Sequence, residues 1–199
     1  MTQNAAHNLQ LRPEFFMTTL FSSLPEVASV MDPLTIFKNG ASPLLELHDE
    51  VLRDESALSV GERELIAAYV SGLNACNYCF GAHVSIASSY GIDEHVFEQL
   101  IEDPEGADID SKLKPLLAYV RKLTLSMTKM IPSDAEAVYA AGWDERALYD
   151  VIMVCALFNF MNRLVEGTGC KPGAYTDTEA SPGKIKSYVQ LGKMMEVQE

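Results

Sequence analysis

Basic side chains are scarce in this sequence. Its 199 residues include 15 Lys and Arg against 28 Asp and Glu, which gives a formal net charge of −13 at pH 7. Nucleic-acid phosphates are bound by clustered Lys and Arg, and anionic membrane surfaces by basic amphipathic helices. Because neither pattern occurs here, we expect no nucleic-acid partner and no membrane partner.

The sequence also lacks the apolar segments that direct a chain into or across a membrane. The first residues, Met1–His7, have neither a basic start nor an apolar run, so no signal peptide is predicted. The longest apolar-rich stretch, Val151–Met161, is too short to span a bilayer. We therefore expect a cytoplasmic protein. In that compartment a pair of nearby cysteines is more often catalytic or metal-binding than a structural disulfide.

No segment alternates apolar and polar residues as a half-buried strand does. Apolar residues instead recur at helical spacing, and capping residues precede several of these stretches, such as Ser59 with Glu62, and Asp144. With 48% apolar residues the chain can bury a substantial core, so we predict one all-α domain with extensions. The similar stretches Gly91–Glu94 and Gly142–Glu145 each join two predicted helices and suggest repeated helical hairpins.

The chemistry of the chain centres on a C-x-x-C motif. Cys76 and Cys79 are followed by His83, and on a helix that begins near Cys76 the three would form one stripe. A thiol reacts as its thiolate, which a base or a positive field stabilises, and two thiols at this spacing can also close a disulfide. Glu64 precedes the motif, about 18 Å from Cys76 if the helix were continuous. A break at residues 72–74, which include glycine and asparagine, would let Glu64 face the cysteines.

The residues alone leave other interpretations of the motif open. Cysteine is often a small buried hydrophobe, and Cys155, in an apolar stretch, is expected to be one. Cys76, Cys79 and His83 could supply three zinc ligands, but no fourth ligand is evident nearby, so we expect no bound metal. A further alternative is a redox-sensing scaffold protein, whose disulfide changes conformation and partner binding without turnover.

The pattern of Glu64, Cys76, Cys79 and His83 resembles the active-site signature of the alkylhydroperoxidase D (AhpD) and carboxymuconolactone decarboxylase-like superfamily. The later run Leu157–Arg163 is similar to the closing helix of that family. The family is all-helical and its members assemble as trimers or hexamers. The resemblance therefore implies an AhpD-like multi-helix fold and a homo-oligomer. True decarboxylases of the superfamily lack the cysteine pair, so its presence here argues against lactone decarboxylation.

The resemblance also divides the chain into three parts. Residues 43–167 correspond to the AhpD-like helical core. Residues 1–42 are an N-terminal extension with short helices, similar to that of the longer, peroxidase-related branch. Residues 168–199 are expected to form a C-terminal loop and a short helix.

The resemblance implies a role for each residue of the motif. Cys79 would be the more buried thiolate that attacks a hydroperoxide, and Cys76 the exposed thiol that closes the disulfide. His83 and Glu64 would form the proton relay. Tyr78 stands where the best-known members carry a second histidine; it could pass a hydrogen bond in the relay but is a poor base near neutral pH.

The activity implied is that of a thiol-dependent peroxidase, an oxidoreductase that reduces hydroperoxides or the disulfide of a partner protein. Such an enzyme needs no metal, flavin or other cofactor of its own. Its electrons would come from an external thiol donor, either a dihydrolipoyl protein or a thioredoxin-like protein.

Overall fold

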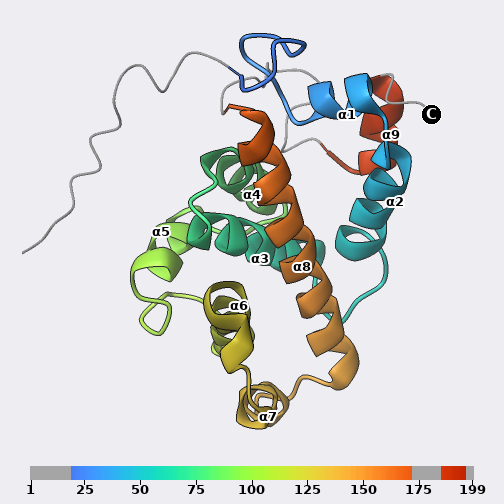
Figure 1. Cartoon of the computed structure of the whole chain (residues 1–199). Helices are drawn as coiled ribbons and strands as arrows, with labels where there is room; N and C mark the ends of the chain where they lie inside the picture. The colour runs from blue at the N-terminus through green and yellow to red at the C-terminus, as the bar shows by residue number, and fades with distance from the viewer. Residues whose placement is uncertain (1–18, 172–184, 196–199) are drawn as a thin grey trace, which may run out of the picture.

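The computed structural model describes residues 19–171 and 185–195 of the chain. Within these residues it contains nine α-helices, one short 3-10 helix and no β-strand, which confirms the all-α prediction (Figure 1). The helices are α1 (Met31–Phe37), α2 (Ala41–Leu52), α3 (Val60–Leu73), α4 (Asn77–Ser89), α5 (His95–Glu102), α6 (Lys114–Ser126), the 3-10 helix η2 (Met127–Lys129), α7 (Pro132–Ala140), α8 (Glu145–Thr168) and α9 (Tyr188–Met194).

Helix α3 lies at the centre of the fold and is buried over most of its length. It begins at the predicted capping box: the Glu62 N–H donates to Ser59 Oγ at 3.2 Å, and the Ser59 N–H donates to Glu62 Oε2 at 2.7 Å. It packs most extensively against α4 and also against α8, α6 and α5. A helix that is apolar on nearly all sides belongs in a core, so α3 is the element on which the others are placed.

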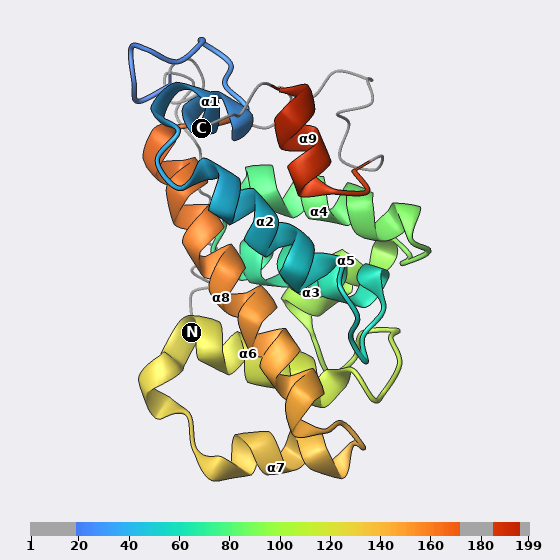
Figure 2. The ribbon, with the colours of Figure 1, turned by 90° about the vertical axis from the view of Figure 1, so that its right-hand side faces the viewer.

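Helix α8 runs along almost the whole molecule (Figures 1 and 2). It begins at Asp144, whose Oδ1 accepts a hydrogen bond of 2.8 Å from the Ala147 N–H, and ends before Gly169, which has a φ of +77°. Its 24 residues are long and apolar enough to cross a membrane by length and composition alone. Half of the most apolar 18-residue stretch of α8 is buried inside the protein. The helix packs against α2, α3 and α6, as the core helix of a soluble protein does.

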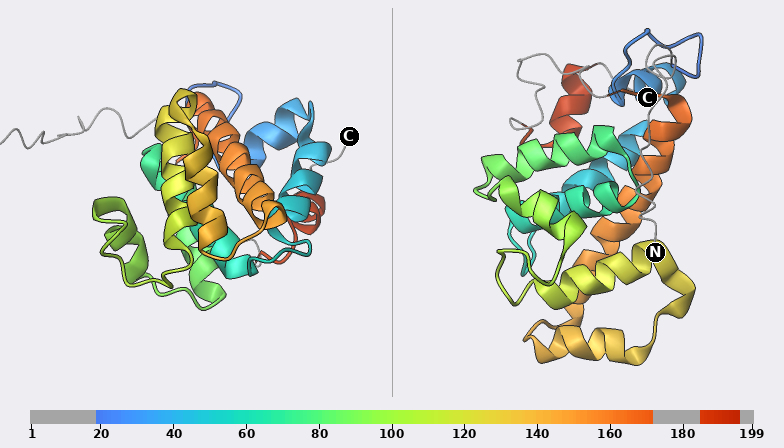
Figure 3. Two further views of the ribbon diagram at one scale, coloured as in Figure 1. Left: turned by 90° about the horizontal axis from the view of Figure 1, so that it is seen from below. Right: turned by 90° about the vertical axis from the view of Figure 1, so that its left-hand side faces the viewer.

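The remaining helices surround α3 and α8. Helix α7 lies at one end of the molecule, whereas α1 and α9 lie at the other (Figures 1 and 2). Seen from below, α5 and the pair α2 and α9 occupy opposite flanks (Figure 3). Of the N-terminal extension, residues 19–30 form turns and irregular backbone, and α1 is the one complete helix among its described residues.

His48 is buried where α2 meets α8 and α9. Its Nδ1 lies 2.7 Å from the carbonyl oxygen of Leu44, and its ring lies 4.9 Å from the ring of Tyr188 and 6.1 Å from that of Phe158, measured between centroids. Burial lowers the pKa of His48 to about 4, although the hydrogen bond to Leu44 raises it in part. The His48 imidazole is therefore neutral in the folded protein at neutral pH.

We predict that His48 makes the fold sensitive to acid. Its pKa is near 6.5 in an unfolded chain, so between pH 6.5 and 4 the unfolded chain binds a proton that the folded chain does not. This stability is fully present above pH 6.5, and about 3 kcal/mol of it is lost by pH 4. Urea unfolding at pH 7 and pH 4 measures the total loss of stability, which should be about 3 kcal/mol smaller in His48→Phe than in the wild type.

The control is His95→Asn, which changes an exposed histidine and should keep the full acid loss. An equal loss in the wild type and in His48→Phe would contradict the assignment.

Candidate active site

The turn between α3 and α4 brings the motif and the carboxylate together. Helix α3 ends at Leu73, Asn74 caps it, and Ala75 takes up the left-handed conformation with a φ of +56°. Cys76 is then the N-cap of α4. The chain therefore turns back, and His83 on α4 meets Glu64 on α3.

The break lies at residues 74–76 and so overlaps only the end of the predicted range 72–74, because Gly72 and Leu73 remain within α3. Gly72 is needed for close packing instead, since a Cβ there would approach Ile101 Cδ1 to 2.6 Å. Asn74 does act in the break, as predicted, and the left-handed residue is an alanine. Alanine in this conformation costs about 1 kcal/mol, which the surrounding packing must offset.

Glu64 is the fully buried centre of the site. Its Oε2 lies 2.5 Å from His83 Nδ1, and its Oε1 accepts a hydrogen bond of 2.6 Å from Arg53 Nη1. Burial alone would raise the pKa of Glu64, but the charge and hydrogen bond of His83, followed by those of Arg53, lower it below its ordinary value. Glu64 is therefore held as a carboxylate, and it orients the imidazole. The His83 ring is also fixed by an edge contact with Phe158, at 4.3 Å between centroids.

Arg53 and Tyr188 are site residues that the sequence did not reveal. The Arg53 guanidinium carbon lies 5.0 Å from the centroid of the Tyr188 ring, and Arg53 Nη2 donates a hydrogen bond of 3.3 Å to the carbonyl oxygen of Ile185. The Tyr188 hydroxyl donates to Glu64 Oε1 at 3.4 Å. Neither residue lies in a recognisable pattern; the one available signal was the short helix expected within residues 168–199.

Both cysteines of the motif are buried free thiols, with exposed fractions of 0% for Cys76 and 4% for Cys79. The prediction that Cys76 is exposed is therefore wrong. The cause is residues 20–30, called the strap below, whose Leu24 and Ala28 pack in one small apolar cluster with the two cysteines. This cluster is separate from the main core and also contains Val165 of α8, together with Tyr78 and Cys170.

The pKa values of the two thiols are shifted in opposite directions. A hydrogen bond from Cys76 lowers the pKa of Cys79, burial opposes this, and the positive charge of His83 and a hydrogen bond from Asn162 lower it further. The same bond to Cys79 raises the pKa of Cys76, as do burial and a hydrogen bond to Glu166. Cys79 is therefore the thiol that ionises first, and Cys76 is the one that keeps its proton.

Asn162 belongs to a network of amides that supports the motif. It is 2% exposed, its Nδ2 donates a hydrogen bond of 3.0 Å to Ser71 Oγ, and its Oδ1 accepts one of 2.9 Å from Asn74 Nδ2. Asn74 Nδ2 also lies 3.2 Å from Asn159 Oδ1. The network joins α8 to the turn that precedes Cys76.

Tyr78, the predicted relay residue, is buried beside the cysteines. Its hydroxyl accepts a hydrogen bond of 2.9 Å from the backbone N–H of Val30, in the strap. Its part in proton transfer stays a prediction. Its position gives it a second role, as a support for the strap.

The zinc interpretation needs three or more ligands that converge on one point. Among residues 19–171 and 185–195, no group of three His, Cys, Asp or Glu side chains could hold a metal ion. His83 Nδ1 is already engaged by Glu64, so this nitrogen is not available as a metal ligand.

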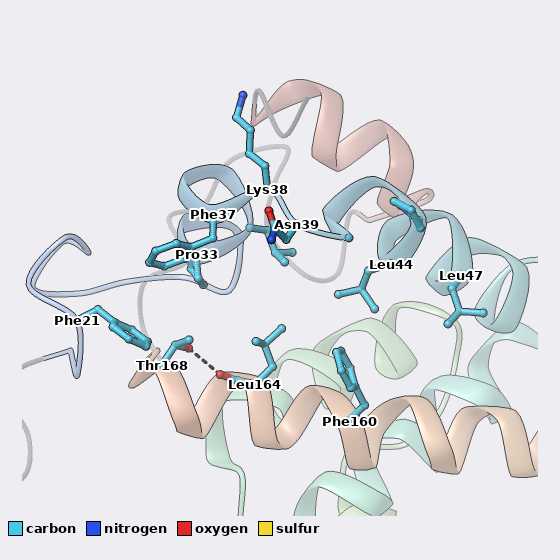
Figure 4. Close-up of a pocket in the computed structure, with 13 residues that line it drawn as sticks. Phe21, Pro33, Phe37, Lys38, Asn39, Leu44, Leu47, Phe160, Leu164 and Thr168 are labelled. Atoms are coloured by element: carbon cyan, nitrogen blue, oxygen red, sulfur yellow. Dashed lines mark hydrogen bonds between the residues drawn. The ribbon is translucent and has the colours of Figure 1, made fainter. Parts of the chain in front are cut away.

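An apolar pocket of about 550 Å³ lies between α2, the end of α1 and α8. Figure 4 shows Leu44 of α2 facing Leu164 and Phe160 of α8 across it, with Phe21 and Phe37 at one side. Neither cysteine of the motif lines this pocket, nor do the buried carboxylate and the imidazole beside it. The pocket and the dithiol are therefore separate features.

Comparison with known proteins agrees with this geometry. The carboxymuconolactone decarboxylase family matches residues 41–105, a range that runs from α2 to α5 and contains Arg53, Glu64, His83 and both cysteines of the motif. A search of curated proteins finds no match.

Two crystal structures share the fold. An uncharacterized peroxidase-related protein from Silicibacter sp. TM1040 is 27% identical, with a TM-score of 0.68 over 73% of this chain and 76% of that chain. A structure from Ralstonia eutropha JMP134, described as an alkylhydroperoxidase AhpD core and an uncharacterized peroxidase-related protein, is 26% identical, with a TM-score of 0.65 over 69% of this chain and 72% of that chain. These matches support the AhpD and carboxymuconolactone decarboxylase-like superfamily, which the cysteine motif predicted.

We predict that Arg53→Met lowers the free energy of unfolding by about 3 kcal/mol, because it leaves one oxygen of the buried Glu64 carboxylate without its ion-pair partner. Glu64→Gln should cost less in the Arg53→Met background than in the wild type. In that background it removes a carboxylate that has already lost its ion pair with Arg53. Urea unfolding at pH 7 of the four proteins measures both effects.

The matched control is Arg146→Met, which breaks a surface pair with Asp150 and should change stability by at most about 0.5 kcal/mol. If Arg53→Met costs no more than this control, the ion pair does not support the fold.

Proposed function

We propose that the protein is a thiol-dependent peroxidase of the alkylhydroperoxidase type, with Cys79 as the attacking thiolate. The observation that carries the proposal is that Cys79 has a lowered pKa next to the buried Glu64–His83 couple. The names of the two similar crystal structures, both peroxidase-related, support the same chemistry.

The first step would form one S–O bond and break the O–O bond of the hydroperoxide. The Cys79 thiolate attacks the terminal oxygen, sulfur is oxidised to sulfenic acid, and the alkoxide leaves as an alcohol after it takes a proton. His83, held by Glu64, is placed to supply that proton and to accept the next one. Cys76 then attacks the sulfenic sulfur, so that the Cys76–Cys79 disulfide forms and water leaves.

An external dithiol completes the cycle. A dihydrolipoyl or thioredoxin-like donor would reduce the disulfide by thiol exchange, and its own two thiols would become the oxidised product. No cofactor bound by the chain is needed for this sequence of steps. We further propose that the protein acts in the cytoplasm as a homo-oligomer, with a trimer or a hexamer as the expected assembly.

A redox-sensing scaffold is the second candidate, and the burial of both thiols favours it. Cys76 has no exposed surface, so an external donor cannot reach it in this conformation. A sensor would form the same disulfide and keep it, whereas an enzyme would turn over. Both candidates predict that the peptide with Cys76 and Cys79 loses two hydrogens after peroxide treatment.

We expect the wild type to consume an organic hydroperoxide continuously when supplied with a dithiol donor, and Cys79→Ser to consume none above background. Consumption is followed with dihydrolipoamide and with a thioredoxin-like protein as donors, at pH 7. Cys155→Ser is the control and should keep its activity, because Cys155 lies in the main core and outside the cluster around the motif. One turnover without a second, with every donor, would favour the sensor.

We predict that His83→Gln slows the alkylation of Cys79 by iodoacetamide at pH 7 about tenfold, the effect of raising the thiol pKa by about one unit. Glu64→Gln should slow it less, because a carboxylate beside a thiol acts favourably only through the imidazole. In the His83→Gln background, Glu64→Gln should have little further effect. Independent effects of the two substitutions across pH 6 to 9 would show that His83 and Glu64 do not form a relay.

A further inference from the structure

The strap, residues 20–30, is the part of the chain that closes over the dithiol. Its Leu24 and Ala28 are buried in the small cluster that also holds Cys76 and Cys79. Ala28 and Cys76 are both fully buried, although neither contributes to the main core. The strap therefore packs mainly on this small cluster, which includes Val165 of α8, and it touches the main core only through the half-buried Val30.

Hydrogen bonds hold the strap to the end of α8 and to the residues that follow it. The Leu20 N–H donates to the carbonyl oxygen of Thr168 at 3.3 Å, and the Lys171 N–H donates to that of Ala28 at 3.2 Å. Cys170 Sγ donates to the carbonyl oxygen of Ser29 at 3.3 Å.

Gly169 lets the strap approach α8, because a Cβ there would lie 2.8 Å from the Leu20 nitrogen. The final attachment is on α4 itself. The Val30 N–H donates to the Tyr78 hydroxyl at 2.9 Å, and Tyr78 stands between the two cysteines in the sequence. The strap is thus tied directly to the motif that it covers.

We propose that the strap determines which reactants reach the dithiol, and that the Tyr78 hydroxyl is the group that holds it closed. The proposal rests on the proposed function for the identity of those reactants. A small hydroperoxide needs only a brief opening. A thiol on a donor protein must come into bonding contact with a sulfur of the Cys76–Cys79 disulfide. The strap must therefore move away from the two cysteines before a donor protein can react.

Local opening of this kind is energetically accessible. Opening breaks the contacts of the small cluster, a few hydrogen bonds and the contact of Val30 with the main core, whereas the buried residues of the main core stay packed on one another. Tyr78→Phe removes the acceptor for the N–H of the half-buried Val30, so the closed strap loses this hydrogen bond. The loss of this hydrogen bond from the closed form shifts the opening equilibrium about tenfold toward the open form.

Alkylation of the reduced protein tests the gate without any turnover. Iodoacetamide serves as the small probe and a polyethylene-glycol maleimide as the bulky one, and peptide mass spectrometry measures the rate at Cys76 and Cys79. We expect Tyr78→Phe to raise the rate about tenfold with iodoacetamide, and at least as much with the maleimide. Leu24→Ala, which removes an apolar anchor of the strap, should act in the same direction.

The pH dependence separates a gate from a change in thiol chemistry. An opening equilibrium multiplies the rate by the same factor at every pH from 6 to 9, whereas a changed pKa moves the midpoint of the profile. Tyr149→Phe, at an exposed tyrosine of α8, is the matched control and should leave the rates unchanged. Unchanged urea unfolding confirms that each variant keeps its core.

The proposal is overturned if Tyr78→Phe and Leu24→Ala both alkylate like the control, or if only the pH midpoint moves. It is also overturned if Glu166→Ala, at the exposed neighbour of Cys76 on α8, opens the site while the strap variants do not. Gated alkylation in a protein that consumes no hydroperoxide would keep the gate and reject the peroxidase function.

Discussion

The buried carboxylate of Glu64 is the constraint on which the rest of the site depends. A fully buried carboxylate such as Glu64 is tolerated only when its oxygens have hydrogen-bond partners and a positive charge lies beside it. Arg53 meets one oxygen and His83 the other. These partners come from the end of α2 and from α4, while Tyr188 of α9 approaches from a third side. One ionised group on α3 thereby fixes how three other helices are placed.

The same arrangement prepares the dithiol for reaction. The turn at Asn74 and Ala75 sets Cys76 at the start of α4, and Asn162 supports that turn from α8. His83 is held between Glu64 and the ring of Phe158, so its orientation is set before any reactant arrives. The hydrogen bond between the two thiols lowers the pKa of Cys79 and raises that of Cys76, and the charge of His83 lowers the pKa of Cys79 further.

Two segments outside the family match at residues 41–105 complete the site. The strap covers the thiols, and α9 covers the carboxylate through Tyr188. The docking of α9 is itself specific, because Asp49 accepts hydrogen bonds from the backbone N–H groups of Tyr188 and Val189. The matched core thus carries the cysteine motif, Glu64 and His83, whereas these two segments cover them.

The sequence by itself determined the helical class, the starts of α3 and α8, and the grouping of Cys79 with His83 on α4. These features follow from local periodicity, capping and short spacing, which the chain carries in its order of residues. Only the tertiary structure decided that Arg53 and Tyr188 complete the Glu64 site, and that Cys76 is covered rather than exposed. The reason is that burial and charge pairing between distant segments depend on how helices pack, and spacing along the chain does not encode that packing.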